Sequence, residues 1–160
     1  MSSDEAFLAA LWKALKEVRL EAILVGSAGA AIQGAPVTTQ DFDILIRDTA
    51  LNREKLNALA THIGAARPRK LSPLASAVTL VGADVPVDVL FDELIGAIKF
   101  EAVRSRAVTI RLGRVGIVTA SLSDIIASKR AAGRPKDKAQ LPVLETALRV
   151  LQEIAKTKKE

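Results

Sequence analysis

Residues 24–46 read LVGSAGAAIQGAPVTTQDFDILI, and this stretch decides the expected fold. An apolar run over residues 22–25 leads into Gly26-Ser27, and a segment of small residues with high helix propensity follows. After a loop that contains Gly and Pro, residues 42–46 are apolar and β-branched. The pattern therefore predicts a strand, a tight turn, a helix over 28–33 and a second strand.

Hydrophobic periodicity predicts further elements outside this stretch. Apolar residues at helical spacing predict helices over 4–18, about 50–62 and 122–132, and a last helix that Pro142 opens. Strand-like segments are predicted as a pair within 75–90, broken at 82–84, and at 108–110 and 115–118. Because the pair within 75–90 has the composition of a hairpin, we expect an α+β fold with a mixed β-sheet flanked by helices.

The length and composition favour one folded domain. The 160 residues are 49% hydrophobic and 26% charged, which is enough apolar material for one core. We expect a single domain over 1–155 and a basic C-terminal tail over 156–160, which we expect to fray. The absence of Cys excludes a disulfide scaffold, a Cys-ligated metal site and a thiol nucleophile, and it fits a cytoplasmic protein.

Charge and hydropathy limit the classes of partner. The longest uncharged stretch, residues 22–40, contains three Gly and one Pro, so no membrane span is expected. The first residues, MSSDEAF, are acidic where a secretory signal would be basic. The net charge of +5 favours a polyanionic partner such as RNA. The basic residues are scattered, however, so charge alone does not establish a nucleic-acid interface.

An acidic pair lies on the second predicted strand. Asp41 and Asp43 are two residues apart, so both carboxylates point to one face with Cα atoms about 6–7 Å apart, while Phe42 faces the other way. Asp88 interrupts the apolar segment 85–90, where a lone buried carboxylate would be costly. The three carboxylates are hard oxygen ligands of the kind that Mg²⁺ or Mn²⁺ takes. The alternative is that Asp41 caps a turn while Asp43 and Asp88 face solvent.

The turn before the short helix offers a phosphate site. Gly26 and Ser27 stand where free backbone N–H groups and the helix dipole attract an anion. Two better-known phosphate motifs fail here. Gly29 and Gly34 have the spacing of a P-loop but lack the Lys-Ser/Thr that must follow, and the dinucleotide fingerprint lacks its glycine spacing. Asp48 alone stands about where a ribose-binding acid would.

Residues 24–46 resemble the DNA polymerase β-type nucleotidyltransferase superfamily. The superfamily pattern is a Gly-Ser turn that opens a helix, a strand with two alternating Asp residues, and a third acid on a neighbouring strand; Thr39 also matches it. Within the superfamily the chain is similar to small bacterial nucleotidyltransferase-like proteins that are related to the AbiEii toxins and to antibiotic nucleotidyltransferases. Residues 128–137, SKRAAGRPKD, resemble a second block of these proteins. The Arg often found before Thr39 is absent, because Val37 and Gln40 stand there.

The resemblance implies a role for each matching residue. Gly26 and Ser27 would hold a triphosphate, Asp41 and Asp43 would bind the bridging metal, and Asp88 would complete a second metal site. Catalysis would then come from positioning and charge neutralisation, without a covalent enzyme intermediate.

Basic residues near the second block have two interpretations each. Lys129 lies on the same helix face as the predicted apolar stripe at positions 122, 125 and 126, so its side chain would project toward the sheet and reach a phosphate. The alternative is that its aliphatic chain only extends along the edge of the core. Arg134 and Lys136 would add to triphosphate or acceptor binding, or would only pair with Asp137 at a helix junction.

Two other residues are assigned structural roles. His62, near the end of a predicted helix, is read as a surface or C-terminal capping residue. Trp12 lies on the apolar stripe of the first helix and is read as core or interface packing.

The leading hypothesis is a metal-dependent nucleotidyltransferase that moves NMP from a nucleoside triphosphate to a hydroxyl and releases pyrophosphate. The acceptor is left open among an RNA 3′ end, a small molecule and a protein side chain, and it would bind across a homodimer or arrive with a partner. The alternative is a non-catalytic nucleotidyltransferase-like binding module of a toxin–antitoxin pair, with an antitoxin-type protein partner. That alternative gains if Asp88 faces away from Asp41 and Asp43.

Overall fold

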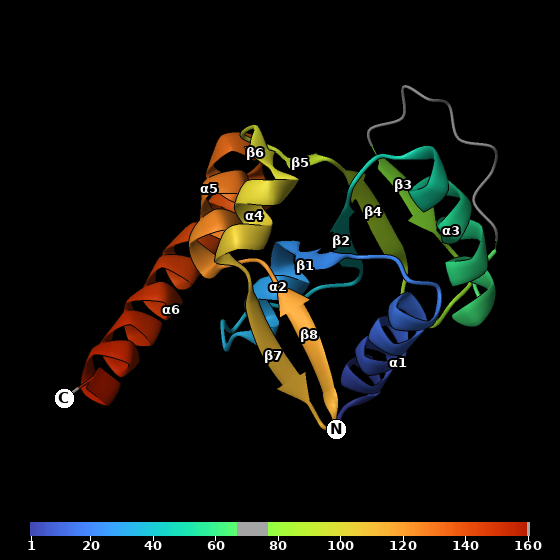
Figure 1. The fold of residues 1–160 in the computed structure, drawn as a ribbon. Coiled ribbons are helices and arrows are strands. Elements are labelled where there is room, and N and C mark those ends of the chain that lie inside the picture. The colour runs from blue at the N-terminus through green and yellow to red at the C-terminus, as the bar shows by residue number, and fades with distance from the viewer. Residues whose placement is uncertain (67–76, 160) are drawn as a thin grey trace.

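A six-stranded mixed β-sheet organises the chain, which we describe from a computed structural model over residues 1–66 and 77–159 (Figure 1). The strand order is β3-β4-β2-β1-β8-β7. The strands of this sheet are β1 (Ile23–Val25), β2 (Phe42–Ile46), β3 (Ala77–Leu80), β4 (Val87–Phe91), β7 (Val108–Leu112) and β8 (Val115–Thr119). A separate two-stranded hairpin is formed by β5 (Glu93–Leu94) and β6 (Ile98–Lys99).

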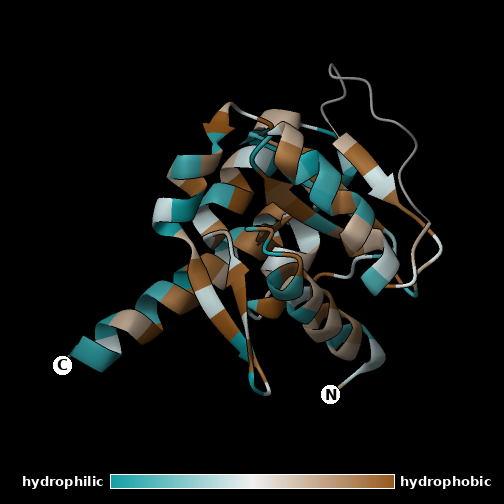
Figure 2. Ribbon diagram, turned by 45° about the vertical axis from the view of Figure 1, so that its right-hand side comes forward, coloured by the Kyte–Doolittle hydropathy of each residue, from teal (hydrophilic) through white to brown (hydrophobic). Residues whose placement is uncertain are grey.

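Helices cover both faces of the sheet (Figure 1). They are α1 (Ser3–Glu17), α2 (Gly26–Ile32), α3 (Ala50–His62), α4 (Phe100–Arg106), α5 (Leu122–Ala132) and α6 (Pro135–Lys159). One buried cluster joins α1 and α3 to the sheet, and a second joins α2, α4, α5 and α6 to its other face. Figure 2 shows hydrophobic residues along the central strands, whereas hydrophobic and hydrophilic residues alternate along α6. The predicted α+β fold with a mixed sheet between helices is confirmed.

Strand pairing explains why the sheet is mixed. β2 pairs parallel with β4 and β1 pairs parallel with β8, while β1–β2, β3–β4 and β7–β8 are antiparallel. The hairpin predicted within 75–90 is present as β3 and β4, although residues 75 and 76 lie outside the described part of the chain. Along β2, Phe42 stacks on Phe7 of α1 at 5.8 Å between ring centroids, on the face opposite the neighbouring Asp43.

The last helix differs from the prediction. It begins at Pro135, so the prediction that Pro142 opens it is wrong, and Pro142 lies inside α6. Pro142 has no backbone N–H to donate to the carbonyl of Lys138, four residues earlier. Because Lys138 is exposed, water can bind this carbonyl instead. Gly133 ends α5 in the left-handed conformation at φ 62°, so α5 and α6 are joined by a very short turn. α6 also continues through the Lys-rich end to Lys159 instead of fraying from Lys156.

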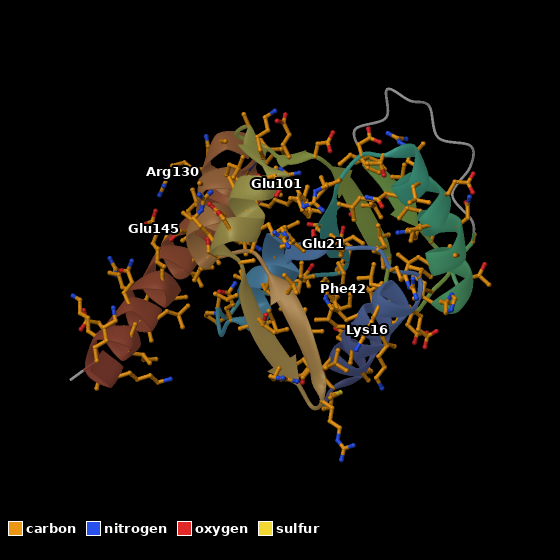
Figure 3. The ribbon with its side chains drawn as sticks, viewed as in Figure 1. Lys16, Glu21, Phe42, Glu101, Arg130 and Glu145 are labelled. Atoms are coloured by element: carbon orange, nitrogen blue, oxygen red, sulfur yellow. The ribbon has the colours of Figure 1, made fainter. Side chains whose placement is uncertain are left out.

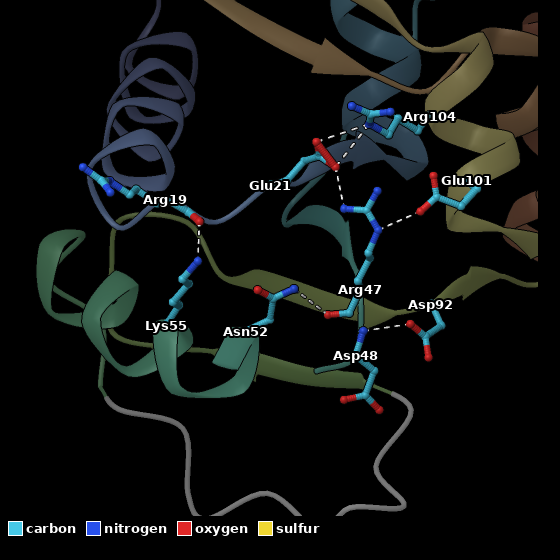
Figure 4. A network of polar contacts seen from close by, with 9 residues as sticks. All are labelled: Arg19, Glu21, Arg47, Asp48, Asn52, Lys55, Asp92, Glu101 and Arg104. Atoms are coloured by element: carbon cyan, nitrogen blue, oxygen red, sulfur yellow. Dashed lines mark hydrogen bonds and ion pairs between the residues drawn. The ribbon is translucent and has the colours of Figure 1, made fainter. Parts of the chain in front are cut away.

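Three elements between β4 and β7, namely β5, β6 and α4, were not predicted. α4 and the β5–β6 hairpin are too short for a clear hydrophobic period, and tertiary contacts stabilise them. Figure 4 shows how α4 is attached: Arg47, just after β2, binds both Glu21 and Glu101 at 2.7 Å, and Arg104 of α4 binds Glu21 at 3.2 Å. The guanidinium of Arg47 also lies 4.3 Å from the centre of the Phe100 ring.

The central strands determine the stability of this fold. We expect Ile44→Ala, at a fully buried position of β2, to lower the free energy of unfolding by about 2–5 kcal/mol because it leaves a cavity. Urea denaturation measures the change. Leu51→Ala, at a position that is 63% exposed, is the control and should alter stability by no more than about 0.5 kcal/mol. Equal effects of the two substitutions would contradict this account of the core.

Candidate active site

Three carboxylates meet on the face of the sheet that carries α5. Asp43 of β2 and Asp88 of β4 are direct partners in the parallel register of these strands. Asp41 lies one residue before β2. One oxygen atom from each side chain lies within 4.8 Å of the others. The alternation along β2 puts Asp41 and Asp43 on one face, and the pairing of β2 with β4 brings Asp88 to them.

Burial and mutual repulsion make these carboxylates reluctant to ionise together. Burial, then the negative charges of Asp41 and Asp88, raise the pKa of Asp43 to about 7. The pKa of Asp41 is raised by its hydrogen bond with Asp88 and by burial. Burial opposes ionisation of Asp88, but hydrogen bonds from Asp41, Thr79 and Asp43 lower its pKa below the ordinary value. A bound cation would favour full ionisation of such a cluster at neutral pH, and its hard oxygen ligands fit Mg²⁺ or Mn²⁺.

Gly26 lets α2 begin directly beside the carboxylates. Its φ is +65°, and a Cβ atom at this position would lie 2.3 Å from Oδ2 of Asp43. A glycine therefore meets two requirements here, a left-handed backbone and a close approach to a side chain. Since α2 has only seven residues, its dipole is a minor part of the site, and the neighbouring side chains matter more.

A buried lysine reaches the start of α2 from α5. The Nζ atom of Lys129 donates a hydrogen bond to Oγ of Ser27 at 3.0 Å, and Ser27 donates to Oε1 of Gln140 at 3.1 Å. Lys129 Nζ also lies 3.7 Å from Oδ1 of Asp137, which is fully buried. Burial lowers the pKa of Lys129, whereas the charges of Asp137 and Asp43 act against this shift.

The other two basic residues take different positions. Arg134 donates a hydrogen bond from Nε to Oδ2 of Asp137 at 2.6 Å. This is the pairing at the helix junction that the sequence offered as one of two interpretations. The half-exposed side chain of Arg134 also lines the cavity. Hydrogen bonds from Arg134 lower the pKa of Asp137 despite the burial of that carboxyl. Lys136 lines the same cavity, and its positive charge favours ionisation of Asp41 and Asp88.

The candidate residues therefore share one cavity of about 360 Å³. Carboxylates form one wall of it, and hydroxyl and basic groups form another; these are Gly26, Ser27, Asp41, Asp43, Asp88, Lys129, Arg134 and Lys136. The cavity therefore brings carboxylates of the kind that bind a divalent cation together with basic groups of the kind that bind phosphate. The condition that would favour a non-catalytic module, an Asp88 facing away from the other two, is not met.

Three supporting residues were not predicted as part of the site. Thr79 lies opposite Asp88 in the β3–β4 register and donates a hydrogen bond to its Oδ1 at 2.6 Å. Gln140 was missed because the helix that carries it was expected to begin at Pro142. Asp137 was predicted only as a partner of Arg134 and Lys136 at a helix junction; it does pair with Arg134, but it is also buried beside Lys129. For Thr79, the hairpin signal in the sequence is the only pointer to its cross-strand partner.

Residues outside the cavity have structural contacts. His62, in the last turn of α3, lies on the surface with Nε2 at 3.1 Å from Glu17 Oε2. Trp12 is buried in the cluster beneath α1, as its position on the apolar stripe predicts. Asp48 accepts a hydrogen bond from Arg53 at 2.6 Å and does not line the cavity, so the structure gives no support to a ribose-binding acid there.

The raised pKa of Asp43 predicts a pH-dependent stability in EDTA. Because the pKa is about 7 in the folded protein against an ordinary value of 3.8, the free energy of unfolding should fall as pH rises between these values. Asp43→Asn should flatten this slope and raise the melting temperature at pH 8 by a few degrees, roughly what 1 kcal/mol produces. Thermal unfolding from pH 4 to 8 measures it, with the exposed Asp84→Asn as control. Identical slopes in wild type and Asp43→Asn would refute the assignment.

The close approach at Gly26 gives a second prediction. Gly26→Ala should destabilise the protein by about 1 kcal/mol more than Gly34→Ala in denaturant titrations. Both positions have positive φ, but a Cβ at Gly34 meets no atom within 4 Å, so only the Gly26 substitution adds a collision with Asp43. Equal losses would show that Asp43 moves away at little cost.

Comparison with known proteins agrees with this description. No protein-family model matches the chain, and no curated protein matches it in sequence. Solved structures do match. The solution structure of the antibiotic-resistance factor ANT(2'')-Ia has a TM-score of 0.67 at 15% identity, over 98% of this chain and 93% of that one. The crystal structure of ANT(2'')-Ia with adenylyl-2''-tobramycin has a TM-score of 0.65 at 16% identity, over 99% and 100%.

A third match comes from Thermotoga maritima. The crystal structure of a candidate nucleotidyltransferase from this organism has a TM-score of 0.61 at 20% identity, over 96% of both chains. All three alignments cover nearly the whole of each protein, so the likeness extends over the sheet and the helices on both of its faces. The sequence resemblance and the architecture therefore agree: the chain has the nucleotidyltransferase fold.

Proposed function

We propose that the protein is a metal-dependent nucleotidyltransferase that transfers NMP from a nucleoside triphosphate to a hydroxyl and releases pyrophosphate. One observation carries the proposal: three carboxylates within 4.8 Å of one another share a cavity with a buried lysine that binds the start of α2. Carboxylates that bind a divalent cation and cationic groups that bind phosphate are the two parts that nucleotidyl transfer requires. The nucleotidyltransferase fold of the chain supports the same conclusion.

The carboxylates supply the metal site in this proposal. Asp41, Asp43 and Asp88 would hold Mg²⁺ or Mn²⁺, which when bound neutralises phosphate charge and lowers the pKa of a coordinated hydroxyl. Thr79 fixes one oxygen of Asp88 through its 2.6 Å hydrogen bond. Thr39 restrains the chain at Asp41, because its hydroxyl donates to the Asp41 carbonyl at 2.6 Å. Both threonines thus limit the movement of the carboxylates before substrate arrives.

The basic wall orients the triphosphate. Lys129 is 8% exposed, so its ammonium group is held beside Ser27 and has little rotamer freedom. Asp137 holds both Lys129 and Arg134, and it thereby positions two cations with one buried carboxylate. A triphosphate that binds these cations presents its α-phosphorus to the carboxylates, which leaves the pyrophosphate on the side of α5 and α6.

The acceptor is proposed only as a hydroxyl group. The neighbour ANT(2'')-Ia was solved in complex with adenylyl-2''-tobramycin, which is a small molecule. A small molecule, an RNA 3′ end and a protein side chain all offer the hydroxyl that the reaction needs, and the net charge of +5 favours RNA among them. We place the protein in the cytoplasm in this proposal, where nucleoside triphosphates are available. The described residues contain no helix of the length and hydropathy that crossing a membrane requires.

The proposal predicts metal-dependent nucleotide binding. In calorimetric titrations with ATP, CTP, GTP and UTP in the presence of Mg²⁺, at least one triphosphate should bind the wild type, and EDTA should abolish that binding. The double variant Asp41→Asn/Asp43→Asn should weaken it by about 100-fold or more, because the metal site is lost. Asp84→Asn, an exposed acid outside the cavity, is the matched control and should bind as wild type does.

Turnover separates an enzyme from a binding module. Pyrophosphate release should follow when the bound triphosphate is supplied with the correct acceptor class, tested as total tRNA, an aminoglycoside mixture and a protein extract. A folded wild-type protein that binds none of the four triphosphates with Mg²⁺ would overturn the proposed function. Binding without pyrophosphate release from any acceptor class would favour the non-catalytic module.

A further inference from the structure

One end of the cavity is apolar, and the roles proposed above leave it without an occupant. Its walls there include Leu90, Leu94, Ile95 and Ala132. Leu94 is 5% exposed, but Ile95, the next residue, is 48% exposed at the tip of the β5–β6 hairpin. When a flat apolar ligand covers a half-exposed isoleucine on the wall of a cavity, the buried apolar area makes binding more favourable.

The face of α5 connects this apolar end to the phosphate-binding end. Ile125, Ser128, Lys129 and Ala132 all line the cavity, and their spacing of three and four residues puts them on one helix face. Lys129 lies beside Ser27, and Ala132 lies three residues further along the helix. One molecule that binds Lys129 through its phosphates therefore also reaches Ala132, one helical turn away.

The hairpin that carries Ile95 is held firmly against α5. A Cβ atom built on Gly96 would lie 3.0 Å from the Cβ of Ala131, so the hairpin backbone touches the helix. Phe100, which follows the hairpin, is buried and donates its backbone N–H to the Asp92 carbonyl at 2.7 Å. These contacts hold Ile95 in a fixed place beside α5.

The opposite wall brings the apolar end close to the carboxylates. Leu90 follows Asp88 by two residues on β4, so both side chains lie on one face with Cα atoms about 6–7 Å apart. A nucleotide whose α-phosphate lies at Asp88 and whose outer phosphates lie at Lys129 still has its nucleoside to place. The apolar surface of Leu90, Leu94 and Ile95 begins one strand repeat from the carboxylates.

We propose that Leu94, Ile95 and Ala132 form the slot for the nucleobase, an inference that rests on the proposed function. These three side chains carry no hydrogen-bonding group, so they hold a planar base through apolar contact area. Contact area favours the larger base. The slot therefore binds purine nucleotides more tightly than pyrimidine nucleotides, by about 3–10-fold, and its side chains distinguish adenine from guanine weakly.

The test compares ATP with inorganic tripolyphosphate, which has the same phosphates and no base. In calorimetric titrations with Mg²⁺, Ile95→Asn should weaken ATP binding roughly 5–20-fold, because a polar side chain replaces an apolar contact. The affinity for tripolyphosphate should stay within twofold of wild type. Ile95→Val should retain most of the ATP affinity. Leu51→Asn, at a position that is 63% exposed in α3 and outside the cavity, is the matched control.

The outcomes separate this inference from the proposed function. Equal affinities of the wild type for ATP and tripolyphosphate, or equal losses of both in Ile95→Asn, would overturn the base slot while leaving the metal and phosphate site in place. A preference for pyrimidine triphosphates would overturn it as well. If the wild type binds neither tripolyphosphate nor any of the four nucleoside triphosphates with Mg²⁺, the proposed function fails first, and the slot fails with it.

Discussion

The parallel register between β2 and β4 is the constraint on which the site depends. It places Asp43 directly beside Asp88, although two carboxylates in a half-buried position repel each other. Apolar contacts on the opposite face outweigh this repulsion, since Ile44, Val87 and Val89 are fully buried there. A shift of the strand register by one residue would turn these side chains out of the core. Burial of the hydrophobic face therefore fixes the register, and this register places Asp43 beside Asp88 despite their repulsion.

The basic side of the cavity is assembled by a different kind of interaction. Buried Asp137 of α6 holds Lys129 of α5 and Arg134 of the connecting turn, and Lys129 in turn binds Ser27 of α2. Figure 3 shows a second link between α5 and α6 on the outer surface, where Arg130 and Glu145 point toward one another. The buried pairing determines where the cations lie, and the surface pair adds little, because exposed ion pairs are weak.

The cavity therefore combines three chemistries in one space. Carboxylates of the sheet, cations of α5 and α6, and apolar side chains of the β5–β6 hairpin meet around it. A nucleoside triphosphate has a matching sequence of groups, with anionic phosphates at one end and a flat, largely apolar base at the other. The hairpin matters in this arrangement because it adds Leu94 and Ile95 to the apolar lining that Leu90 of β4 and Ala132 of α5 also form, and Gly96 lets it lie close to Ala131.

The amino-acid sequence by itself determined the strand–helix–strand order over residues 22–46, although α2 begins at Gly26, where a turn was expected. It also determined the helix bounds near α1, α3 and α5 and the common face of Asp41 and Asp43, because these features follow from local periodicity. Only the tertiary structure decided three other features. These are the hydrogen bond between Thr79 and Asp88, the burial of Asp137 beside Lys129, and the start of α6 at Pro135. Each of these depends on strand register or helix packing between distant segments, and pairing energies of that kind leave no periodic trace in the local sequence.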